Sequence, residues 1–389
     1  HAMRQRGVGL HQARAVEGLT DESMARLGAL PYLAGTHRAP ARDGVVIHVK
    51  GLAFEGVNFV VSADAPEATL IDMEGRVLHR WTLAPELLWP EYDAAPMTRR
   101  ARYWRRARLM DDGGVIVLYE GAGLARLDAA SRPIWSRAGE YHHDFDIDSE
   151  GHIHVLQRRQ AASAATPRGF PFLLDHIVTL DQEGAFLSEF SIEECFERSV
   201  FAGMIGGLPR EGDIFHTNTI SWLDGSLAGR SPLFRKGNLL ISQRNTDIVA
   251  IVEPSARKVV WAARSSWKKQ HDPVLLDTGW VLLFDNLGLT DRSRVIEFEP
   301  VSSAMKVIYA GDGPHSFFSA TCGANQRLGN GNTLITESDF GRAFEVTPDG
   351  RIVWEYLNPR RAGERNELIA TLFEVMRFER KQVPLKVLR

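Results

Sequence analysis

The sequence predicts an all-β protein that is folded as a six-bladed β-propeller. A short strand rich in Val, Ile and Leu recurs along the chain, in most copies directly after a turn glycine. A strand–turn–strand hairpin follows each copy, and a further strand precedes the glycine. A unit of four strands that recurs in this way is typical of the blades of a propeller and would be unusual in a barrel or a sandwich.

The expected units follow one another along the chain. The strands after the turn are expected at residues 57–64, 113–121, 151–159, 237–245, 279–286 and 331–338. The hairpins that follow them are expected at residues 68–81, 124–137, 177–190, 248–263, 295–310 and 343–356. The strands that precede the turn are expected at residues 103–112, 141–150, 215–224, 270–278 and 318–328.

The first unit lacks a preceding strand, and the C-terminal part of the chain can supply it. The segment ATLFEVMRFER, residues 370–380, has strand character and is expected to pair with the strand that begins at Val57. Pairing of the N- and C-terminal strands would close the ring and remove two exposed sheet edges. We therefore expect a propeller over residues 41–389. Residues 1–40, with a short helix at 20–30, are expected to form an N-terminal arm.

The charge and the cysteine content argue against two broad classes of protein. With 46 basic and 49 acidic side chains the net charge is −3, which argues against a general nucleic-acid binder. The run TRRARYWRRAR, residues 98–108, is expected to be either a solvated face or a rim that attracts anions. Cys195 and Cys322 are too few for a disulfide framework and are not spaced for a metal site, although one bridge between them stays open. No apolar stretch is as long as a membrane span.

Histidines stand at equivalent positions in different units. His143 lies eight residues before Gly151, and His271 lies eight residues before Gly279. Because the first strand of each blade lines the central channel, equivalent residues of different blades should converge at one mouth. The convergent set is His143, His216, Asn218, His271 and Thr321, with Arg244 and Arg105 beside it. So many polar side chains around one cavity would pack poorly as a core and indicate a functional site.

This set of residues favours some reactions over others. It has no pair of carboxylates of the kind that a glycosidase needs, and the chain shows no Gly-rich nucleotide loop and no Ser nucleophile elbow. Three histidines suit a zinc site, but the guanidinium of Arg244 would repel a cation and favour an anion. Transfer of a sulfuryl or phosphoryl group fits better, because its transition state spreads negative charge over several oxygens that donors can hold.

At these residues the sequence resembles the bacterial arylsulfotransferases, which move sulfate between phenols without a nucleotide sulfate donor. The resemblance extends from about Val57 to the C-terminus and depends on five motifs that stand in the family's order. They are HHDFDID (142–148), FHTNTI (215–220), ISQRNTD (241–247), QHDPVLLDTGWVLLFDN (270–286) and GNGNTLITES (329–338). The resemblance implies a six-bladed propeller, in agreement with the repeat.

The resemblance also implies a ping-pong mechanism through a sulfated histidine. His271 resembles the nucleophile, which must be neutral and must present a free ring nitrogen. The residues that resemble those gripping the sulfuryl group are His143, His216, Asn218, Arg244 and Thr321. Either His143 or His216 would be the general acid and base, and the sequence leaves that choice open. Asp272 would point to the other face of its strand, so its role in orienting His271 stays open too.

The partners and the location are also implied by the resemblance. It implies a small-molecule aryl sulfate donor and a phenolic acceptor, no cofactor and no metal, and a periplasmic or exported protein. The opening His1-Ala2-Met3 resembles a tag remnant, so the sequence leaves open whether a signal or a membrane anchor came before it. The oligomeric state stays open. The extra N-terminal β-domain of the best-known family members has no counterpart in residues 1–40.

Other histidines and aromatic residues receive different predictions. His142, His152 and His154 are expected to be structural. Aromatic residues of the expected mouth loops, residues 86–104 and 200–236, could stack on a substrate ring; they are Trp89, Tyr92, Trp104 and Phe201. Two alternatives to sulfuryl transfer stay open. One is a metal-dependent propeller hydrolase or lyase that uses the same histidines, and the other is a non-catalytic propeller that binds a ligand or a protein at its mouth.

Overall fold

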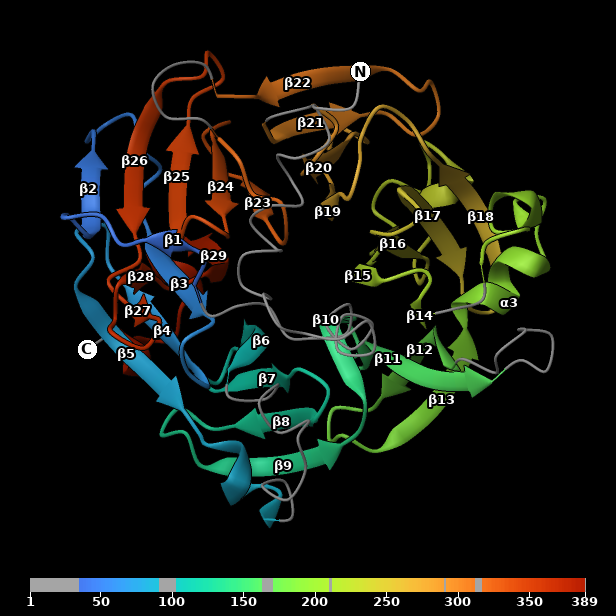
Figure 1. Cartoon of the computed structure of the whole chain (residues 1–389), viewed down its shortest axis with the longest axis horizontal. Coiled ribbons are helices and arrows are strands. Elements are labelled where there is room, and N and C mark those ends of the chain that lie inside the picture. The colour runs from blue at the N-terminus through green and yellow to red at the C-terminus, as the bar shows by residue number, and fades with distance from the viewer. Residues whose placement is uncertain are drawn as a thin grey trace.

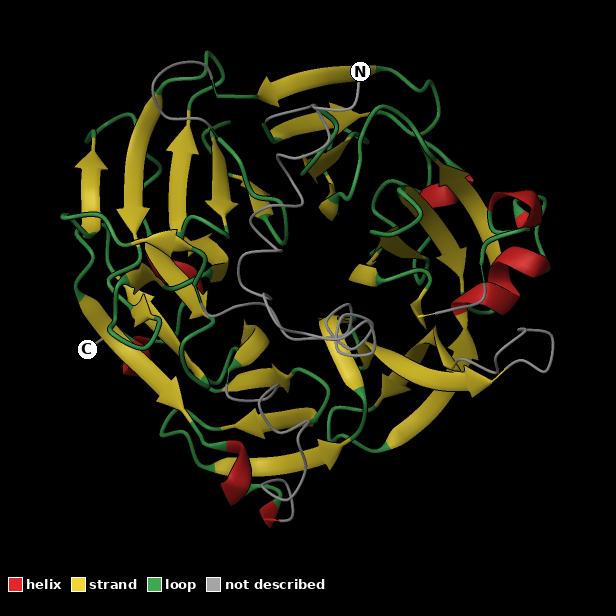
Figure 2. Cartoon of the chain, viewed as in Figure 1, coloured by secondary structure: helices red, strands yellow, loops and turns green. Residues whose placement is uncertain are grey.

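The computed structural model describes residues 35–90, 103–162, 171–209, 212–289, 292–311 and 317–388. Within these residues strands far outnumber helices, so the predicted all-β class is confirmed (Figure 2). Most strands belong to six mainly antiparallel sheets of four or five strands, and these sheets stand around a common centre in Figure 1.

Four of the sheets are built from strands that follow one another in the chain. The first contains β6 (Trp104–Leu109), β7 (Val115–Tyr119), β8 (Gly123–Leu127) and β9 (Pro133–Ala138). The second contains β10 (Tyr141–Ile147), β11 (Ile153–Ala162), β12 (Pro171–Leu180) and β13 (Phe186–Ser191), with β14 (Gly212–Asp213) parallel to β12. The third contains β15 (Thr217–Trp222), β16 (Leu239–Gln243), β17 (Ile248–Glu253) and β18 (Lys258–Ala263). The fourth contains β19 (His271–Leu275), β20 (Val281–Asp285), β21 (Arg294–Phe298) and β22 (Met305–Tyr309).

The other two sheets combine N-terminal and C-terminal strands. One has the order β29 (Leu372–Phe378), β3 (Val57–Ser62), β4 (Glu67–Ile71) and β5 (Val77–Thr82), with Phe378 opposite Val57. The other has the order β2 (Gly44–His48), β26 (Ile352–Leu357), β25 (Arg342–Val346), β24 (Thr333–Glu337) and β23 (Ala324–Arg327). The expected hairpins therefore form with the expected partners. The sequence analysis missed β2, whose residues are all half-buried and lack a clear apolar alternation.

The remaining elements are short. A three-stranded sheet contains β1 (His37–Arg38), β28 (Leu368–Ile369) and β27 (Arg361–Ala362), so the end of the predicted arm lies against the C-terminal part of the chain. In the part of the chain that the structure describes, the helices are α3 (Ile192–Glu197) and the 3₁₀ turns η1 (Pro85–Leu87), η4 (Ala202–Met204), η5 (Pro232–Phe234), η6 (Arg380–Gln382) and η7 (Leu385–Val387). None of the helices in the described part of the chain is long and apolar enough to cross a membrane. The helix expected at residues 20–30 lies outside the described residues.

Tryptophans on outer strands join one sheet to the next. Each lies near the end of a hairpin and donates its indole N–H to a backbone carbonyl in a turn of the following sheet. The pairs are Trp81–Gly113 (3.1 Å), Trp135–Gln182 (3.0 Å), Trp261–Pro300 (3.1 Å) and Trp354–Met73 (3.0 Å). A large apolar ring with one polar atom suits this position, because the ring packs between sheets while its donor is satisfied. These four tryptophans therefore connect neighbouring sheets.

The innermost strands surround the centre of the molecule. They are β6, β10, β15, β19, β23 and β29, and each contacts the next, with β29 contacting β6 (Figure 1). A buried ion cluster joins several of them. The Arg106 guanidinium lies 2.7 Å from Asp144 Oδ1, 2.6 Å from Glu374 Oε1 and 4.0 Å from Asp272 Oδ1. Since these groups come from β6, β10, β19 and β29, the cluster links four sheets around the centre.

Asp272 makes the stability of the protein depend on pH. Burial raises the pKa of Asp272 to about 7; Arg106 opposes the rise and Glu374 adds to it. The carboxyl of Asp272 has a pKa of about 3.9 in an unfolded chain. Between these two pH values the folded protein keeps a proton on Asp272 that the unfolded chain releases. The contribution of this carboxyl to the free energy of unfolding is therefore fully present at low pH, and it is lost as the pH rises through about 7.

We expect Asp272→Asn to remove this dependence. Between pH 5 and pH 8 the natural protein should lose more free energy of unfolding than the variant, by about 3 kcal/mol. Urea unfolding of both proteins at the two pH values measures the difference. Parallel pH dependences would show that Asp272 titrates alike in the folded and unfolded chains.

Candidate active site

Four of the innermost strands have a residue in the left-handed backbone conformation at or close to their start. His143 has φ 58°, His216 has φ 51°, Asp272 has φ 53° and Cys322 has φ 53°. The pairing registers of β10, β15 and β19 shift at the same places. A shift of this kind re-aims the side chains around it. Strict alternation of side chains along a strand therefore does not hold at these positions.

The ring of His271 is held by an asparagine from the neighbouring strand end. His271 Nδ1 lies 2.8 Å from Asn286 Oδ1, and Asn286 Nδ2 donates to Ser319 O and Cys322 O at 2.7 Å each. The two carbonyls fix the orientation of the amide, so its oxygen accepts a hydrogen bond from the N–H group at His271 Nδ1. His271 Nε2 then carries the lone pair, and this buried atom has no hydrogen-bond partner among the described residues.

Charge and burial keep His271 neutral. Burial, followed by the positive charge of Arg244, holds the pKa of His271 well below its usual value. Asp272, which the sequence left open as the orienting group, is engaged elsewhere: its Oδ2 accepts a hydrogen bond from Asn325 N at 2.7 Å. The orienting role falls to Asn286, which the sequence analysis did not single out.

His143 and His216 contact each other directly. Their Nε2 atoms are 3.0 Å apart, and His216 Nδ1 lies 2.6 Å from Asp213 Oδ2. Burial, together with the neighbouring ring of His216, holds the pKa of His143 well below its usual value. Burial also lowers the pKa of His216, although Asp213 opposes this shift. Asp213 lies three residues before His216, a spacing that could have indicated the pair in the sequence.

Asp213 is kept ionised by its neighbours. Burial alone would raise the pKa of Asp213, but Arg158 and His216 outweigh it and hold the pKa well below the usual range. Arg158 Nη2 lies 3.1 Å from Asp213 Oδ2, which gives the carboxylate a cationic partner besides the imidazole. A carboxylate in this state holds His216 with its proton on Nδ1, so Nε2 of His216 faces His143.

Two arginines lie close to the histidines. Arg105 is buried, its Nη2 lies 3.8 Å from Cys322 Sγ and its guanidinium stands 4.7 Å from the ring centre of Phe373. Arg244 is half-buried and donates to Asn245 Oδ1 at 3.2 Å. Both arginines act electrostatically on His271 and lower its pKa. Positive charge beside a neutral imidazole favours an anionic ligand.

Asn218 and Thr321 have their side chains engaged by other groups. Asn218 Nδ2 donates to Gln270 O at 2.8 Å, just before His271 in the chain. Thr321 Oγ1 donates to Asp339 Oδ1 at 2.6 Å. The structure thus brings together His143, His216, His271, Arg105 and Arg244, and gives Asn218 and Thr321 supporting hydrogen bonds beside them.

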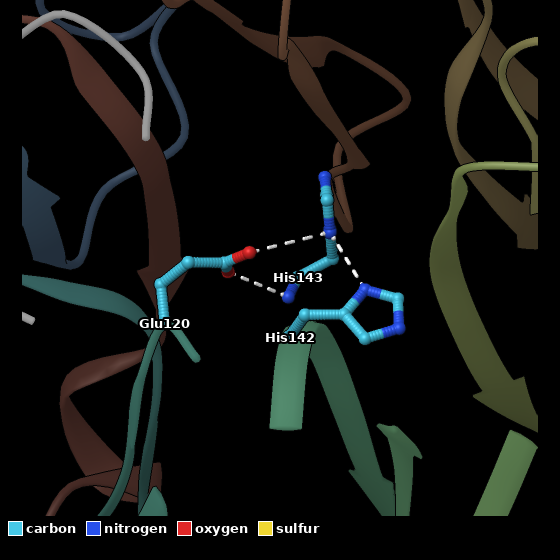
Figure 3. Close-up of side chains that lie close together, drawn as sticks. All are labelled: Glu120, His142 and His143. Carbon is cyan, nitrogen blue, oxygen red and sulfur yellow. Dashed lines mark hydrogen bonds and ion pairs between the residues drawn. The ribbon is translucent and has the colours of Figure 1, made fainter. Parts of the chain in front are cut away.

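His142 belongs to the site, which the sequence analysis did not expect. His142 Nδ1 lies 2.8 Å from His143 Nδ1, whereas His152 and His154 contact Asp148 at 3.0 and 3.3 Å. The oxygens of Glu120 lie 2.8 Å from His143 N and 3.6 Å from His143 Nδ1 (Figure 3). The ring of His142 therefore touches that of His143, and its expected structural role stays a prediction.

Glu120, His142 and His143 place three ligand-type atoms within 4.8 Å of one another. The contact between the two Nδ1 atoms is, however, that of an N–H···N hydrogen bond. Two imidazole nitrogens bound to one zinc ion at about 2.0–2.1 Å in a tetrahedral site would stand about 3.4 Å apart. The distance between the Nδ1 atoms of 2.8 Å therefore fits a shared proton better than a pair of metal ligands.

The predicted aromatic contacts fall into three cases. Trp89 and Trp104 are buried and pack edge-on against Tyr119, with ring centres 5.4 and 6.1 Å away, so they belong to the core. Phe201 is half-buried beside the short turn η4. Tyr92 lies outside the described residues.

Two further features lie apart from the histidines. Cys195 and Cys322 are both free and buried, so the bridge that the sequence left open does not form. A cavity of about 840 Å³ is lined by Asp144, Asp272 and Glu374 among others, and none of the clustered histidines lines it. Its lining comes from the later residues of the inner strands, so it opens toward the other end of those strands.

We expect Asn286 to act as a positioning residue for His271. Asn286→Ala should lower kcat of a reaction at His271 by about 10²-fold, because the ring loses its fixed orientation, while KM for the donor changes little. Asn286→Asp should raise the pKa of His271 and move the activity optimum to higher pH. Profiles of kcat against pH measure both effects, with Asn330→Ala, an exposed asparagine, as control. If Asn286→Ala had the same kcat as the unsubstituted protein, Asn286 would not position His271.

Comparisons with known proteins identify a family for this chain and solved structures with a similar fold. A family model described as Arylsulfotransferase (ASST) matches residues 106–359, and a comparison with curated proteins found no match. Among solved structures, a protein of unknown function from Bacteroides caccae is 15% identical, with a TM-score of 0.52, over 82% of this chain and 98% of the other. A catalytically inactive virginiamycin B lyase from Staphylococcus aureus with quinupristin is 10% identical, with a TM-score of 0.45, over 82% of this chain and 87% of the other. At such low identity the first likeness shows a shared fold alone.

Proposed function

The chain belongs to the arylsulfotransferase family, and we propose that it moves a sulfuryl group from an aryl sulfate ester to a phenolic acceptor through a sulfohistidine at His271. Membership of the family supports aryl sulfotransfer in general. The ping-pong route and the roles of individual residues are the parts that we add from the geometry of the site.

The observation that carries the proposal is the state of the His271 ring. Its Nδ1 is tied to Asn286 at 2.8 Å, and its Nε2 is a buried nitrogen without a hydrogen-bond partner among the described residues. A neutral imidazole with one nitrogen fixed and the other bearing a lone pair is an activated nucleophile. In the first half-reaction Nε2 attacks sulfur in line with the leaving phenol oxygen, and in the second the acceptor phenol attacks the same sulfur.

Positive groups beside His271 support the charge that this transfer develops. Arg105 and Arg244 lie close enough to lower the pKa of His271 and would hold the oxygens of the sulfuryl group. We propose that His143 or His216 exchanges a proton with the phenol oxygen; the contact between their Nε2 atoms and the electrostatic action of His216 on His271 support this role. We also propose that Asn218, whose Nδ2 donates to the carbonyl of Gln270 next to His271, and Thr321 help to bind the sulfuryl group.

We also propose that the six sheets are the blades of a β-propeller over residues 41–389, with residues 1–40 as an arm. The proposal is supported by the six sheets of four or five strands and by the contacts of each innermost strand with the next. Pairing of β29 with β3 and the indole bond from Trp354 to Met73 support a ring closed between N- and C-terminal strands. In such a ring the starts of the innermost strands meet, which explains how histidines far apart in the sequence come together.

Release of 4-nitrophenol from its sulfate ester, with and without an added phenol, tests the proposed function. We expect release to depend on the acceptor and a sulfated phenol to form in equal amount. The same assay after exhaustive chelation, with metal analysis of the protein, separates this reaction from a metal-dependent hydrolase or lyase at the same histidines. Release without an acceptor, or loss on chelation with recovery on adding a divalent metal, would favour the hydrolase or lyase. No release with any phenol would favour a protein that only binds ligands.

A further inference from the structure

Five side chains form one continuous line through the site. Asp213 Oδ2 contacts His216 Nδ1 at 2.6 Å, His216 Nε2 contacts His143 Nε2 at 3.0 Å, and His143 Nδ1 contacts His142 Nδ1 at 2.8 Å. At the far end, His142 Nε2 and Asp175 Oδ1 are 3.4 Å apart, and neither atom has a hydrogen-bond partner among the described residues. The line therefore has four links, of which three are hydrogen bonds.

The protons of neutral imidazoles account for this difference. Three neutral rings carry three N–H groups, which is one fewer than the four links require. If the ionised Asp213 accepts from His216 Nδ1, then His216 Nε2 accepts from His143 Nε2, and His143 Nδ1 accepts from His142 Nδ1. His142 Nε2 is then left as an acceptor that faces the acceptor Asp175 Oδ1. The link that the proton count leaves without a proton is thus the longest of the four, at 3.4 Å.

We infer that Asp213, His216, His143, His142 and Asp175 form a proton wire that holds one additional proton and keeps it available between the two half-reactions at His271. A fourth proton on the three rings would complete the link between His142 Nε2 and Asp175. The wire would then be one imidazolium shared by three rings and held between two carboxylates. This inference depends on the proposed sulfuryl transfer for its catalytic meaning, while the shared proton itself does not.

The proton and charge balance closes over one full turnover. In the first half-reaction the bond between sulfur and the phenol oxygen breaks and the bond between sulfur and His271 Nε2 forms. The phenol oxygen takes a proton from His143 Nε2 of the charged wire, and the proton between the two Nδ1 atoms moves from His142 to His143, so that each ring becomes neutral. The products are a neutral phenol, a sulfated His271 and a neutral wire. In the second half-reaction the acceptor phenol gives its proton back to the wire as its oxygen takes the sulfuryl group.

Charged groups from several elements face this wire. Arg158 on β11 lies 3.1 Å from Asp213 and 4.0 Å from Glu120, and Glu120 lies 3.6 Å from His143 Nδ1. Arg105 on β6 and Arg244 after β16 lower the pKa values of His143 and His216, respectively. Asp175 on β12 is anchored by Thr217 N, which donates to its Oδ2 at 2.7 Å. The carboxylates stabilise the additional proton, and the arginines make it easy to release.

The first test uses leaving groups of different quality. We expect His142→Gln and Asp175→Asn to slow the single-turnover release of phenol from phenyl sulfate by about 10²-fold. Release of 4-nitrophenol, a much better leaving group that needs little protonation, should fall by less than about fivefold. His154→Gln, whose ring contacts Asp148 instead, serves as the control and should leave both rates unchanged. Equal losses for the two donors would show that His142 and Asp175 are merely structural, and would overturn the wire.

The second test does not need activity. In protein labelled with ¹⁵N in its histidine rings, NMR should show His142, His143 and His216 taking up one proton together with a common midpoint. Asp175→Asn should move that midpoint to lower pH. Three separate midpoints, or a midpoint that Asp175→Asn leaves in place, would overturn the wire even if sulfuryl transfer occurs. A shared proton in a protein without transferase activity would instead contradict the proposed function and leave the proton-sharing line standing.

Discussion

His271→Ala is expected to abolish transfer from 4-nitrophenyl sulfate, lowering kcat by on the order of 10⁴-fold or more. The reason is that the variant lacks the ring that Asn286 fixes in orientation and whose Nε2 has no hydrogen-bond partner among the described residues, so the proposed covalent intermediate cannot form. The bond from Asn286 to His271 and the partnerless Nε2 distinguish this ring from His143 and His216, whose Nε2 atoms contact each other. Initial rates of 4-nitrophenol release with a phenol acceptor measure the effect.

Two further observations sharpen the test of His271. Brief incubation with aryl [³⁵S]sulfate in the absence of an acceptor should label the natural protein and leave His271→Ala unlabelled. His154→Ala, a half-buried histidine that contacts Thr179 and Asp148, should retain the label and the activity. Added imidazole should restore part of the activity of His271→Ala if it enters the space left by the ring. Transfer that persists in His271→Ala would assign the nucleophile to another residue.

Arg106→Leu is expected to lower the free energy of unfolding by about 3–5 kcal/mol. The variant would leave the buried carboxylates of Asp144 and Glu374 without their nearest cation, at a point where four sheets meet. Arg108 contacts both carboxylates at 3.7 and 2.9 Å and compensates only in part. Since Asp144 Oδ2 also accepts from Ile220 N at 3.1 Å, loss of order at this carboxylate would extend to β15. Midpoints of urea unfolding measure the loss.

A matched control separates burial from the ion pair itself. Arg132 has the same Nε-to-carboxylate distance to Asp128, 2.7 Å, as Arg106 has to Asp144, but its side chain is 80% exposed rather than 5%. Solvent screens an exposed pair, so Arg132→Leu should leave the unfolding midpoint nearly unchanged. Similar midpoints for Arg106→Leu and Arg132→Leu would show that the central ion cluster does not stabilise the fold.

Some features of the fold could be predicted because their causes are local. The hairpins 248–263 and 343–356 were expected and occur as β17–β18 and β25–β26, because the apolar alternation and the turn residues act within a few positions. Short elements without such a pattern, such as β2 and α3, were missed, and β2 forms only because β26 offers an edge. The repeat also indicated that His143, His216 and His271 would converge.

The amino-acid sequence by itself determined most of the strands and the convergence of His143, His216 and His271, since both follow from a local pattern repeated along the chain. Only the tertiary structure decided their partners: Asn286 rather than Asp272 beside His271, Asp213 at His216, and His142 with Asp175 behind His143. These contacts join different strands and sheets, and they depend on left-handed residues that redirect side chains within a few ångströms. A periodic pattern cannot specify such directions, because a single bulge changes them without changing the pattern.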